Sequence, residues 1–288
     1  MDSSLFGSTN RTVSRLGFGG APAGLTNYLG DYDASNTDHR HMVGAAIERA
    51  LEVGITYFDT AASYGRGASE QIFGDALAGA DIFLATKVSV GDFGNIRASL
   101  ERSLKNLKRD HVDLLQLHGS TYSDDLCNSI LTEGGAADQL QVLKEEGLIR
   151  FSGFTTEDTN GSVTRQIRSG RFDAMQICYN FMYQHPYEPT RPFGTIPEAQ
   201  EGGMGVVTMR TVTSGIFQKF IQAANPANTF DYTPSLLQYV LSNPAVNVAL
   251  VGMRTVKEVE QNAAIVADTD GRFSLKDIHE RYVGPRAK

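Results

Sequence analysis

The chain has 288 residues, of which 41% are hydrophobic and 20% are charged, a composition typical of a globular protein that buries a substantial core. Its formal net charge of -7 argues against nucleic acid or an anionic membrane surface as the main partner. The first residues show no signal peptide pattern and no apolar run is long enough to span a bilayer, so we expect a cytoplasmic protein.

Apolar, strand-like runs alternate with longer stretches of helical spacing along the whole chain. Several of the helical stretches end in glycine, as at Gly54, Gly147 and Gly170, which fits a left-handed C-cap. In chain order the strand–helix units are residues 13–20 with 38–54, 54–60 with 69–79, 82–88 with 96–109, 111–119 with 135–148, 149–155 with 161–170, 172–180 with 196–203, 204–211 with 233–243, and 246–252 with 256–267.

Repetition of the strand–helix unit about eight times predicts a (β/α)8 TIM barrel, formed by a single domain over residues 1–288. A doubly wound open sheet is the alternative architecture. The segment between the first strand and its helix contains no GxGxxG, so the sequence has no Rossmann dinucleotide fingerprint.

Polar residues at the carboxyl ends of barrel strands are the first candidates for chemistry. Asp59, Lys87 and His118 end three consecutive strands, so we expect them to meet at one mouth of the barrel, with Tyr64 in the loop after Asp59. Later strand ends carry Thr155, Gln176, Asn180, Arg210 and Arg254.

The pairing of Asp59 with Lys87 explains how a carboxylate can stand at the end of a buried strand. A tyrosine has an ordinary pKa of about 10, and a nearby ammonium lowers it. Lys87, held by Asp59, is therefore a candidate for tuning Tyr64 as a general acid, while His118 could orient a carbonyl. For Asp59 and Lys87 the plain alternative is a structural ion pair, and for His118 a buried core histidine.

The segment 54–77, GITYFDTAASYGRGASEQIFGDAL, resembles the signature of the aldo-keto reductase superfamily, and later segments resemble its other blocks in order. These are ATKV, SLERSLKNLKRDHVDLLQLH, GLIRFSGFTT and VALVGMRTVKEVEQN, so the resemblance runs from about residue 17 to 262. It implies a (β/α)8 barrel that binds a nicotinamide dinucleotide without a Rossmann motif. It also implies a catalytic tetrad of Asp59, Tyr64, Lys87 and His118, in which the tyrosine protonates the carbonyl oxygen.

The resemblance also implies a set of cofactor-binding residues. Asp59 is among them, Gln176 matches a glutamine that holds the carboxamide, and Met209 stands where many members have a stacking tyrosine. The segment Arg210–Gly215 would wrap the pyrophosphate. The remaining implied residues are Gly20 and Ala21 after the first strand, Thr155 and Thr156 after the fifth, Thr211, Val212, Ser214 and Gly215 in the pyrophosphate segment, and Gly252, Met253, Arg254, Glu258, Gln261 and Asn262 at the adenosine end.

Cofactor preference depends on the charges at the adenosine end, because a 2′-phosphate needs local cations. Arg254 is well placed, with Lys257 as a second candidate, and we expect NADP(H) to be favoured over NAD(H). Glu258 stands where several members have arginine or glutamine, and its carboxylate could repel the phosphate or accept a ribose hydroxyl.

We therefore expect an oxidoreductase that acts on a small carbonyl or sugar substrate, bound by loops 21–38, 118–129 and 179–194. The alternatives are an NAD-dependent sugar dehydrogenase of the same superfamily and a cofactor-binding accessory subunit with little turnover. No metal site is expected, since Cys127 and Cys178 lie in no ligand pattern. Ser69 is expected to be the N-cap of the helix after the signature.

Overall fold

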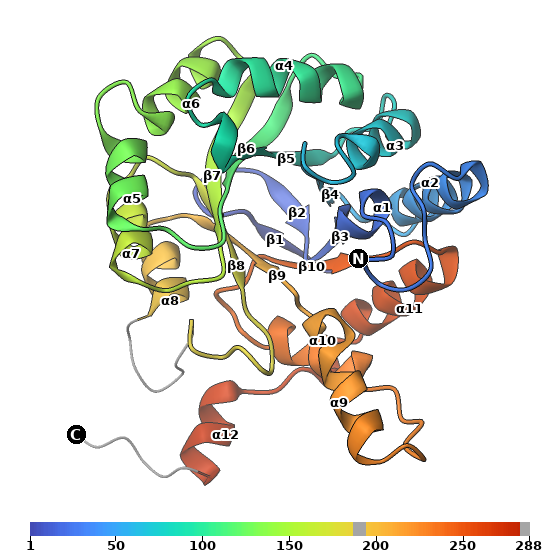
Figure 1. Cartoon of the computed structure of the whole chain (residues 1–288). Coiled ribbons are helices and arrows are strands. Elements are labelled where there is room, and N and C mark those ends of the chain that lie inside the picture. Colours follow the sequence, from blue (N-terminus) through green and yellow to red (C-terminus); the bar gives the residue numbers. More distant parts are fainter. Residues whose placement is uncertain (187–193, 283–288) are drawn as a thin grey trace.

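Eight parallel strands form a closed barrel (Figure 1). The structure, a computed structural model, describes residues 1–186 and 194–282. Within them the barrel order is β10-β3-β4-β5-β6-β7-β8-β9, with every neighbouring pair parallel. The predicted (β/α)8 TIM barrel is confirmed, and the doubly wound open sheet is wrong.

The barrel strands are short and almost wholly buried, as expected when helices cover the outside and side chains fill the inside. They are β3 (Leu16–Gly19), β4 (Tyr57–Asp59), β5 (Phe83–Ser89), β6 (Val112–His118), β7 (Ile149–Thr156), β8 (Ala174–Cys178), β9 (Gly205–Met209) and β10 (Val248–Gly252).

The helices that follow the strands surround the barrel and pack their apolar faces against it (Figure 1). They are α2 (Thr37–Glu52), α3 (Ala68–Ala76), α4 (Ile96–Leu107), α6 (Ala136–Glu145), α7 (Gly161–Arg168), α8 (Thr195–Glu201), α10 (Thr233–Leu241) and α11 (Val256–Ala267). None of the described helices is long and apolar enough to cross a membrane.

Additional elements lie outside the eight-fold repeat. They are the hairpin β1 (Ser3–Leu5) and β2 (Thr12–Ser14), the short helices α1 (Ala21–Gly24) and α5 (Asp124–Leu131), the helices α9 (Ile216–Ala224) and α12 (Leu275–Tyr282), and the 3-10 turns η1 (Val90–Asp92), η2 (Thr213–Gly215) and η3 (Thr269–Gly271). α9 has no buried residue and projects away from the barrel (Figure 1).

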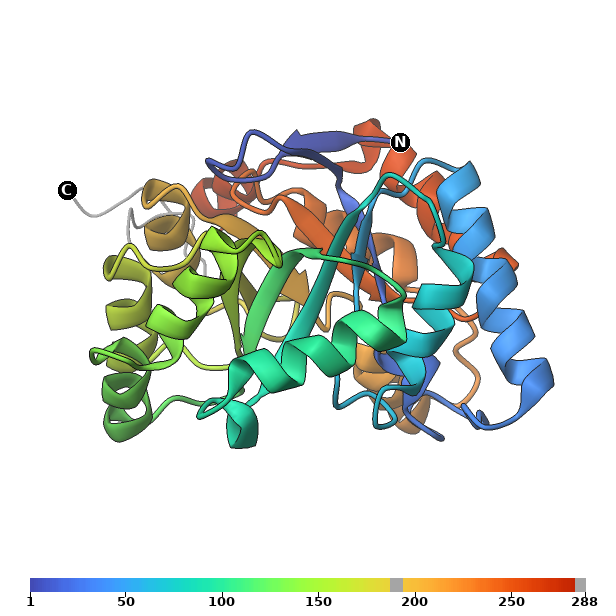
Figure 2. The ribbon, with the colours of Figure 1, turned by 90° about the horizontal axis from the view of Figure 1, so that it is seen from above.

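The β1–β2 hairpin lies across the amino-terminal end of the barrel, at the top of Figure 2. Phe6 lies in the loop between the two hairpin strands and is fully buried. Its ring centroid is 5.7 Å from that of Tyr57 and 5.0 Å from that of Phe83. These rings form the centre of a separate apolar cluster at the start of the strands. The hairpin therefore closes this end of the barrel, and the loops after the strands surround the other end.

Candidate active site

The carboxyl ends of the strands surround a cavity of about 600 Å³, a volume within the usual range for small-molecule sites. Residues from β3, β4, β6, β8, β9 and β10 and from the loops that follow strands form its wall. Of the residues expected from the sequence, the cavity wall contains Gly20, Ala21, Asp59, Tyr64, His118, Gln176, Met209, Arg210, Thr211, Val212, Ser214, Gly215 and Gly252.

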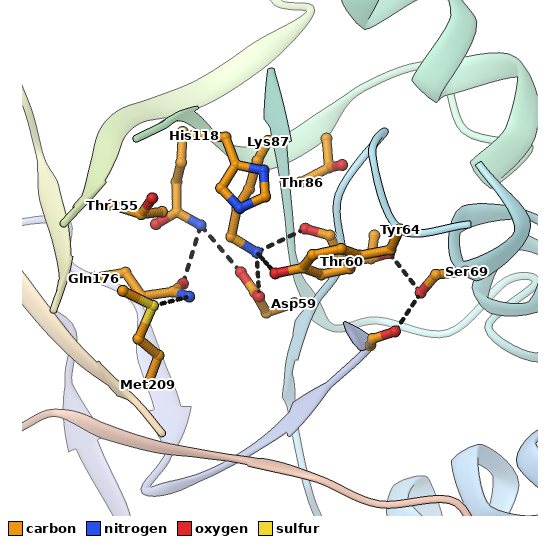
Figure 3. Close-up of polar contacts among 12 residues, drawn as sticks. Asp59, Thr60, Tyr64, Ser69, Thr86, Lys87, His118, Thr155, Gln176 and Met209 are labelled. Carbon is orange, nitrogen blue, oxygen red and sulfur yellow. Dashed lines mark hydrogen bonds and ion pairs between the residues drawn. The ribbon is translucent and has the colours of Figure 1, made fainter. Parts of the chain in front are cut away.

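The Asp59 and Lys87 side chains form an ion pair (Figure 3), of which Asp59 belongs to the cavity wall. Both are buried, with 1% and 0% of their side chains exposed, so neither charge is solvated by water. Lys87 Nζ donates to Asp59 Oδ1 and, at 2.8 Å, to the carbonyl oxygen of Thr60. Burial is the largest single effect and lowers the pKa of Lys87, but the contributions of Asp59 and Tyr64 together outweigh it, and the pKa is raised. Lys87 is therefore an ammonium.

Tyr64 lies over this ion pair, half-buried at the edge of the cavity (Figure 3). Its phenolic oxygen is 3.5 Å from Lys87 Nζ. The expected influence of the ammonium is present, since Lys87 lowers the pKa of Tyr64, but burial is the larger effect and the pKa lies above its ordinary value of 10. Tyr64 in this structure is accordingly a neutral phenol, which can donate a proton.

The turn after Tyr64 fixes the position of its ring. Three consecutive residues have left-handed backbone, Gly65, Arg66 and Gly67, with φ of 62°, 55° and 91°. Gly65 is required because a Cβ there would lie 2.2 Å from the carbonyl oxygen of Gly24. This close contact holds the Tyr64 loop against the loop after the first barrel strand.

The expectation that Ser69 caps α3 is wrong. The N-cap is Gly67, because the left-handed run brings the chain into the helix two residues earlier. Ser69 lies instead in the first turn, where its hydroxyl donates to the Gly20 carbonyl at 2.8 Å and accepts from Thr60 Oγ1 at 2.8 Å. It therefore links the end of β4 to the loop after β3.

His118, at the end of β6, lies beside Tyr64 with the ring centroids 5.6 Å apart in an edge-to-face arrangement. Burial, with a smaller effect of the Lys87 ammonium, lowers the pKa of His118 to about 3. The imidazole is therefore neutral near pH 7. Its Nδ1 is 3.2 Å from the hydroxyl of Ser63, a contact that no sequence pattern predicts.

Gln116, a residue that sequence reasoning did not select, lies inside the barrel among the candidate groups. It is fully buried, and its Nε2 donates to Asp59 Oδ2 at 3.0 Å and to Gln176 Oε1 at 3.3 Å. The Gln176 Nε2 is 3.8 Å from the sulfur of Met209, at the cavity wall (Figure 3). Gln116 could have been found from its position two residues before His118, which puts both side chains on the same face of β6.

The segment Arg210–Gly215 has an unusual backbone conformation. Arg210, Thr213, Ser214 and Gly215 all have positive φ, of 55°, 60°, 50° and 74°. The N–H groups of Thr213 and Gly215 donate within the segment, to the carbonyls of Arg210 and Val212, so contact of this backbone with a pyrophosphate stays a prediction. The Arg210 guanidinium also pairs with Glu157, its Nη2 lying 2.6 Å from the carboxylate, and both residues line the cavity.

Thr155 and Thr156 are buried at the end of β7, and neither lines the cavity. The Thr155 hydroxyl donates to the Gly119 carbonyl at 2.7 Å, and the Thr156 hydroxyl donates to the Asp158 carbonyl at 3.0 Å. These bonds hold neighbouring loops together, so direct contact of the two hydroxyls with a cofactor stays a prediction.

The residues expected at the adenosine end gather around the start of α11, and of them only Gly252 is part of the cavity wall. Glu258 forms a capping box with Thr255, and its carboxylate accepts the N–H groups of Arg254 and Thr255 at 2.7 and 3.0 Å. The Arg254 guanidinium lies 5.0 Å from the centre of the Tyr32 ring. Met253 and Asn262 are buried, and Gln261 is exposed.

Two buried polar atoms at this end have no hydrogen-bond partner among the described residues, Arg254 Nη1 and Asn262 Oδ1. One is a charged donor and the other an acceptor, and buried groups of this kind are usually satisfied. They fit a ligand that carries an anionic group and an amino group, as an adenosine phosphate does. Within the same described residues, no three His, Cys, Asp or Glu side chains are grouped so as to hold a metal ion.

Comparison with known proteins extends this description. The chain matches the model of the Aldo/keto reductase family over residues 15–271. It is 27% identical over 297 residues to L-galactose dehydrogenase of Arabidopsis thaliana, covering 92% of this chain and 88% of that protein. It is 27% identical over 275 residues to a methylglyoxal reductase of Escherichia coli, covering 91% of each. An aldo-keto reductase from Bacillus halodurans, in its holo form, superposes with a TM-score of 0.74 at 25% identity, covering 100% of this chain and 97% of that one.

Proposed function

The chain belongs to the aldo/keto reductase family of oxidoreductases, and we propose that it reduces a small carbonyl compound with NADP(H), using Tyr64 as the proton donor. The observation that carries the proposal is the contact of Tyr64 with Lys87 above the Asp59–Lys87 ion pair, at the wall of a cavity of about 600 Å³. Dinucleotide binding is supported by the positive-φ segment Arg210–Gly215 and by the two unpartnered buried atoms near α11.

The bound nicotinamide would supply the hydride for the carbonyl carbon. Tyr64 donates the proton that the carbonyl oxygen needs, and the Lys87 ammonium stabilises the phenolate left behind. His118, as a neutral imidazole, orients the carbonyl oxygen by a hydrogen bond. Because the pKa of Tyr64 is raised, the phenol is protonated near pH 7, which suits reduction better than oxidation.

The preference for NADP(H) rests on Arg254 and Glu258. Glu258 directs its carboxylate to the backbone at the start of α11, so it serves as a helix cap rather than as an acceptor for a ribose hydroxyl. Arg254 retains one buried donor without a partner in the described part of the chain, which a 2′-phosphate would satisfy.

Sugar oxidation is the second candidate function, because one relative over nearly the full length is an L-galactose dehydrogenase. The same four groups serve both directions of the reaction. A cytoplasmic location and a single domain over the whole chain are compatible with either function and do not distinguish them.

The test is to mix the purified protein with NADPH or NADH and a panel of aldehydes and ketones that includes methylglyoxal. In parallel, NADP⁺ or NAD⁺ is offered with a panel of aldoses that includes L-galactose. Oxidation of NADPH by a carbonyl compound would support the proposal, and reduction of NAD⁺ by an aldose would favour the sugar dehydrogenase. Tight NADPH binding with no turnover on either panel would contradict both and indicate an accessory subunit.

A further inference from the structure

Gln116 occupies the point where the proton-donating groups and the expected nicotinamide-binding side meet. It lies on β6, where its Cα pairs with that of Lys87 on β5 and with Gly153 on β7. Its side chain is fully buried and bonds both Asp59 and Gln176. The Gln116 amide thus joins the two sides of the site, alongside a direct bond of the Gln176 side chain to Asp59.

The hydrogen-bonding capacity of these groups determines how each is oriented. The Gln116 amide nitrogen has two hydrogens, and both are used, one on Asp59 Oδ2 and one on Gln176 Oε1. Asp59 is thereby held at both oxygens, since Lys87 takes the other. Gln176 must direct its oxygen to Gln116 to accept this bond, so its own amide nitrogen is left to face Met209 at the cavity wall and to donate to Asp59.

The Gln116 side chain also lowers the stability of the fold in a way that an apolar residue would avoid. Its Oε1 is buried with no hydrogen-bond partner in the described residues. An apolar side chain of similar volume would fill this position without burying an unpaired carbonyl. The amide is therefore better explained by what its nitrogen orients than by packing.

We propose that Gln116 is a positioning residue that couples the Asp59–Lys87–Tyr64 group to the amide of Gln176, so that Gln176 presents a hydrogen-bond donor to the nicotinamide carboxamide. This inference rests on the proposed function and extends it to a residue that touches neither cofactor nor substrate. Loss of the amide removes the bond that holds the Gln176 oxygen and takes one donor from Asp59 Oδ2.

The test compares Gln116→Met with Gln166→Met, a matched control. Gln166 is also a fully buried glutamine, but it lies on α7, and its amide has no partner in the described part of the chain. For Gln116→Met we expect kcat to fall and the NADPH dissociation constant, measured by fluorescence titration, to rise, each by roughly 10-fold, the effect of losing one hydrogen bond to a charged or orienting group. Gln166→Met should leave both unchanged.

A second variant, Gln116→Glu, adds the pH dependence of activity as a readout, which a defect in packing alone would not alter. The introduced carboxylate repels Asp59 when it is ionised and donates a hydrogen bond to Asp59 when it is protonated, so activity relative to wild type should recover as the pH falls. Gln116→Met should show no such recovery. Unchanged kcat, NADPH affinity and pH profile in both variants would overturn the inference.

The outcome remains readable if the proposed function fails. If the wild type turns over no carbonyl or sugar, NADPH affinity alone decides: a weaker Gln116→Met supports the coupling to Gln176, and an unchanged one overturns it. If Gln116→Met does not fold, the pH dependence of NADPH affinity in Gln116→Glu serves the same purpose.

Discussion

The ammonium nitrogen of Lys87 lies 3.5 Å from the phenolic oxygen of Tyr64, while the same nitrogen is bonded to the Asp59 carboxylate beneath it. The carboxylate and the phenol both belong to residues of the cavity wall, and the ammonium lies between them. A phenol in this place can release a proton to the cavity and leave its negative charge beside a cation.

Replacing Tyr64 by phenylalanine should remove the proton donor and leave the cavity shape unchanged. We expect kcat to fall by roughly 10²- to 10⁴-fold, the usual contribution of a positioned acid, with the NADPH dissociation constant little altered. The matched control is Tyr57→Phe, since the Tyr57 hydroxyl is buried near the closed end of the barrel without a hydrogen-bond partner in the described chain. Full turnover by Tyr64→Phe on every active substrate would contradict the role of Tyr64.

The buried ion pair predicts a strong effect on stability as well as on turnover. Lys87→Met leaves the Asp59 charge buried without its partner, and we expect the free energy of unfolding to fall by about 3–5 kcal/mol. The double variant Asp59→Asn/Lys87→Met removes both charges and should recover part of that loss, but not activity. Urea unfolding measures the stability, and equal stability of the single and double variants would argue against the pair.

The low pKa of His118 predicts how the stability of the fold depends on pH. The folded value of about 3 is below the ordinary value of 6.5, so protonation favours the unfolded chain. The stability contributed by the neutral imidazole is complete above about pH 6.5 and is lost as the pH falls towards 3. NMR titration of the imidazole nitrogens should find His118 neutral at about pH 5, and a His118→Asn variant should lose less stability over the same range. A titration midpoint near 6.5 would refute this assignment.

Cofactor preference should depend on Arg254. Because its guanidinium would pair with the 2′-phosphate, Arg254→Met should raise the KM for NADPH by roughly 10- to 100-fold and leave the KM for NADH nearly unchanged. Lys105→Met, an exposed change on α4, is the control. Equal effects of Arg254→Met on the two cofactors would show that the side chain acts only through the loop, since it also donates to the Leu29 carbonyl.

The barrel is predictable from the sequence because its apolar runs end at recognisable polar residues and its helical stretches often end at glycine. Asp59, Lys87 and His118 lie at or near the ends of apolar runs, and parallel strands bring such ends together. Gln116 does not stand out in the same way, because a single polar residue between leucines is typical of core sequence. Only the three-dimensional arrangement shows which groups it reaches.

Other elements were missed or misplaced because the spacing of apolar residues in the sequence does not predict them. The start of α3 differs from the prediction because Arg66, a non-glycine residue, adopts positive φ. The strands β1 and β2 have three residues each, too few for an alternating pattern to predict them. α9 lies within one barrel unit, between β9 and α10, and is not among the predicted elements, although residues 216–224 have helical spacing. The substrate loop expected at residues 179–194 lies partly outside the described residues.

The hairpin that closes the amino-terminal end of the barrel has a practical consequence for engineering. Phe6 contributes a ring to the base of the barrel, although it lies so early in the chain, and a Cβ on Gly205 would lie 2.5 Å from that ring. A purification tag or a fused protein is therefore better tolerated after α12 than before β1. Library design for new substrates should leave residues 3–14 constant and vary the loops at the opposite end.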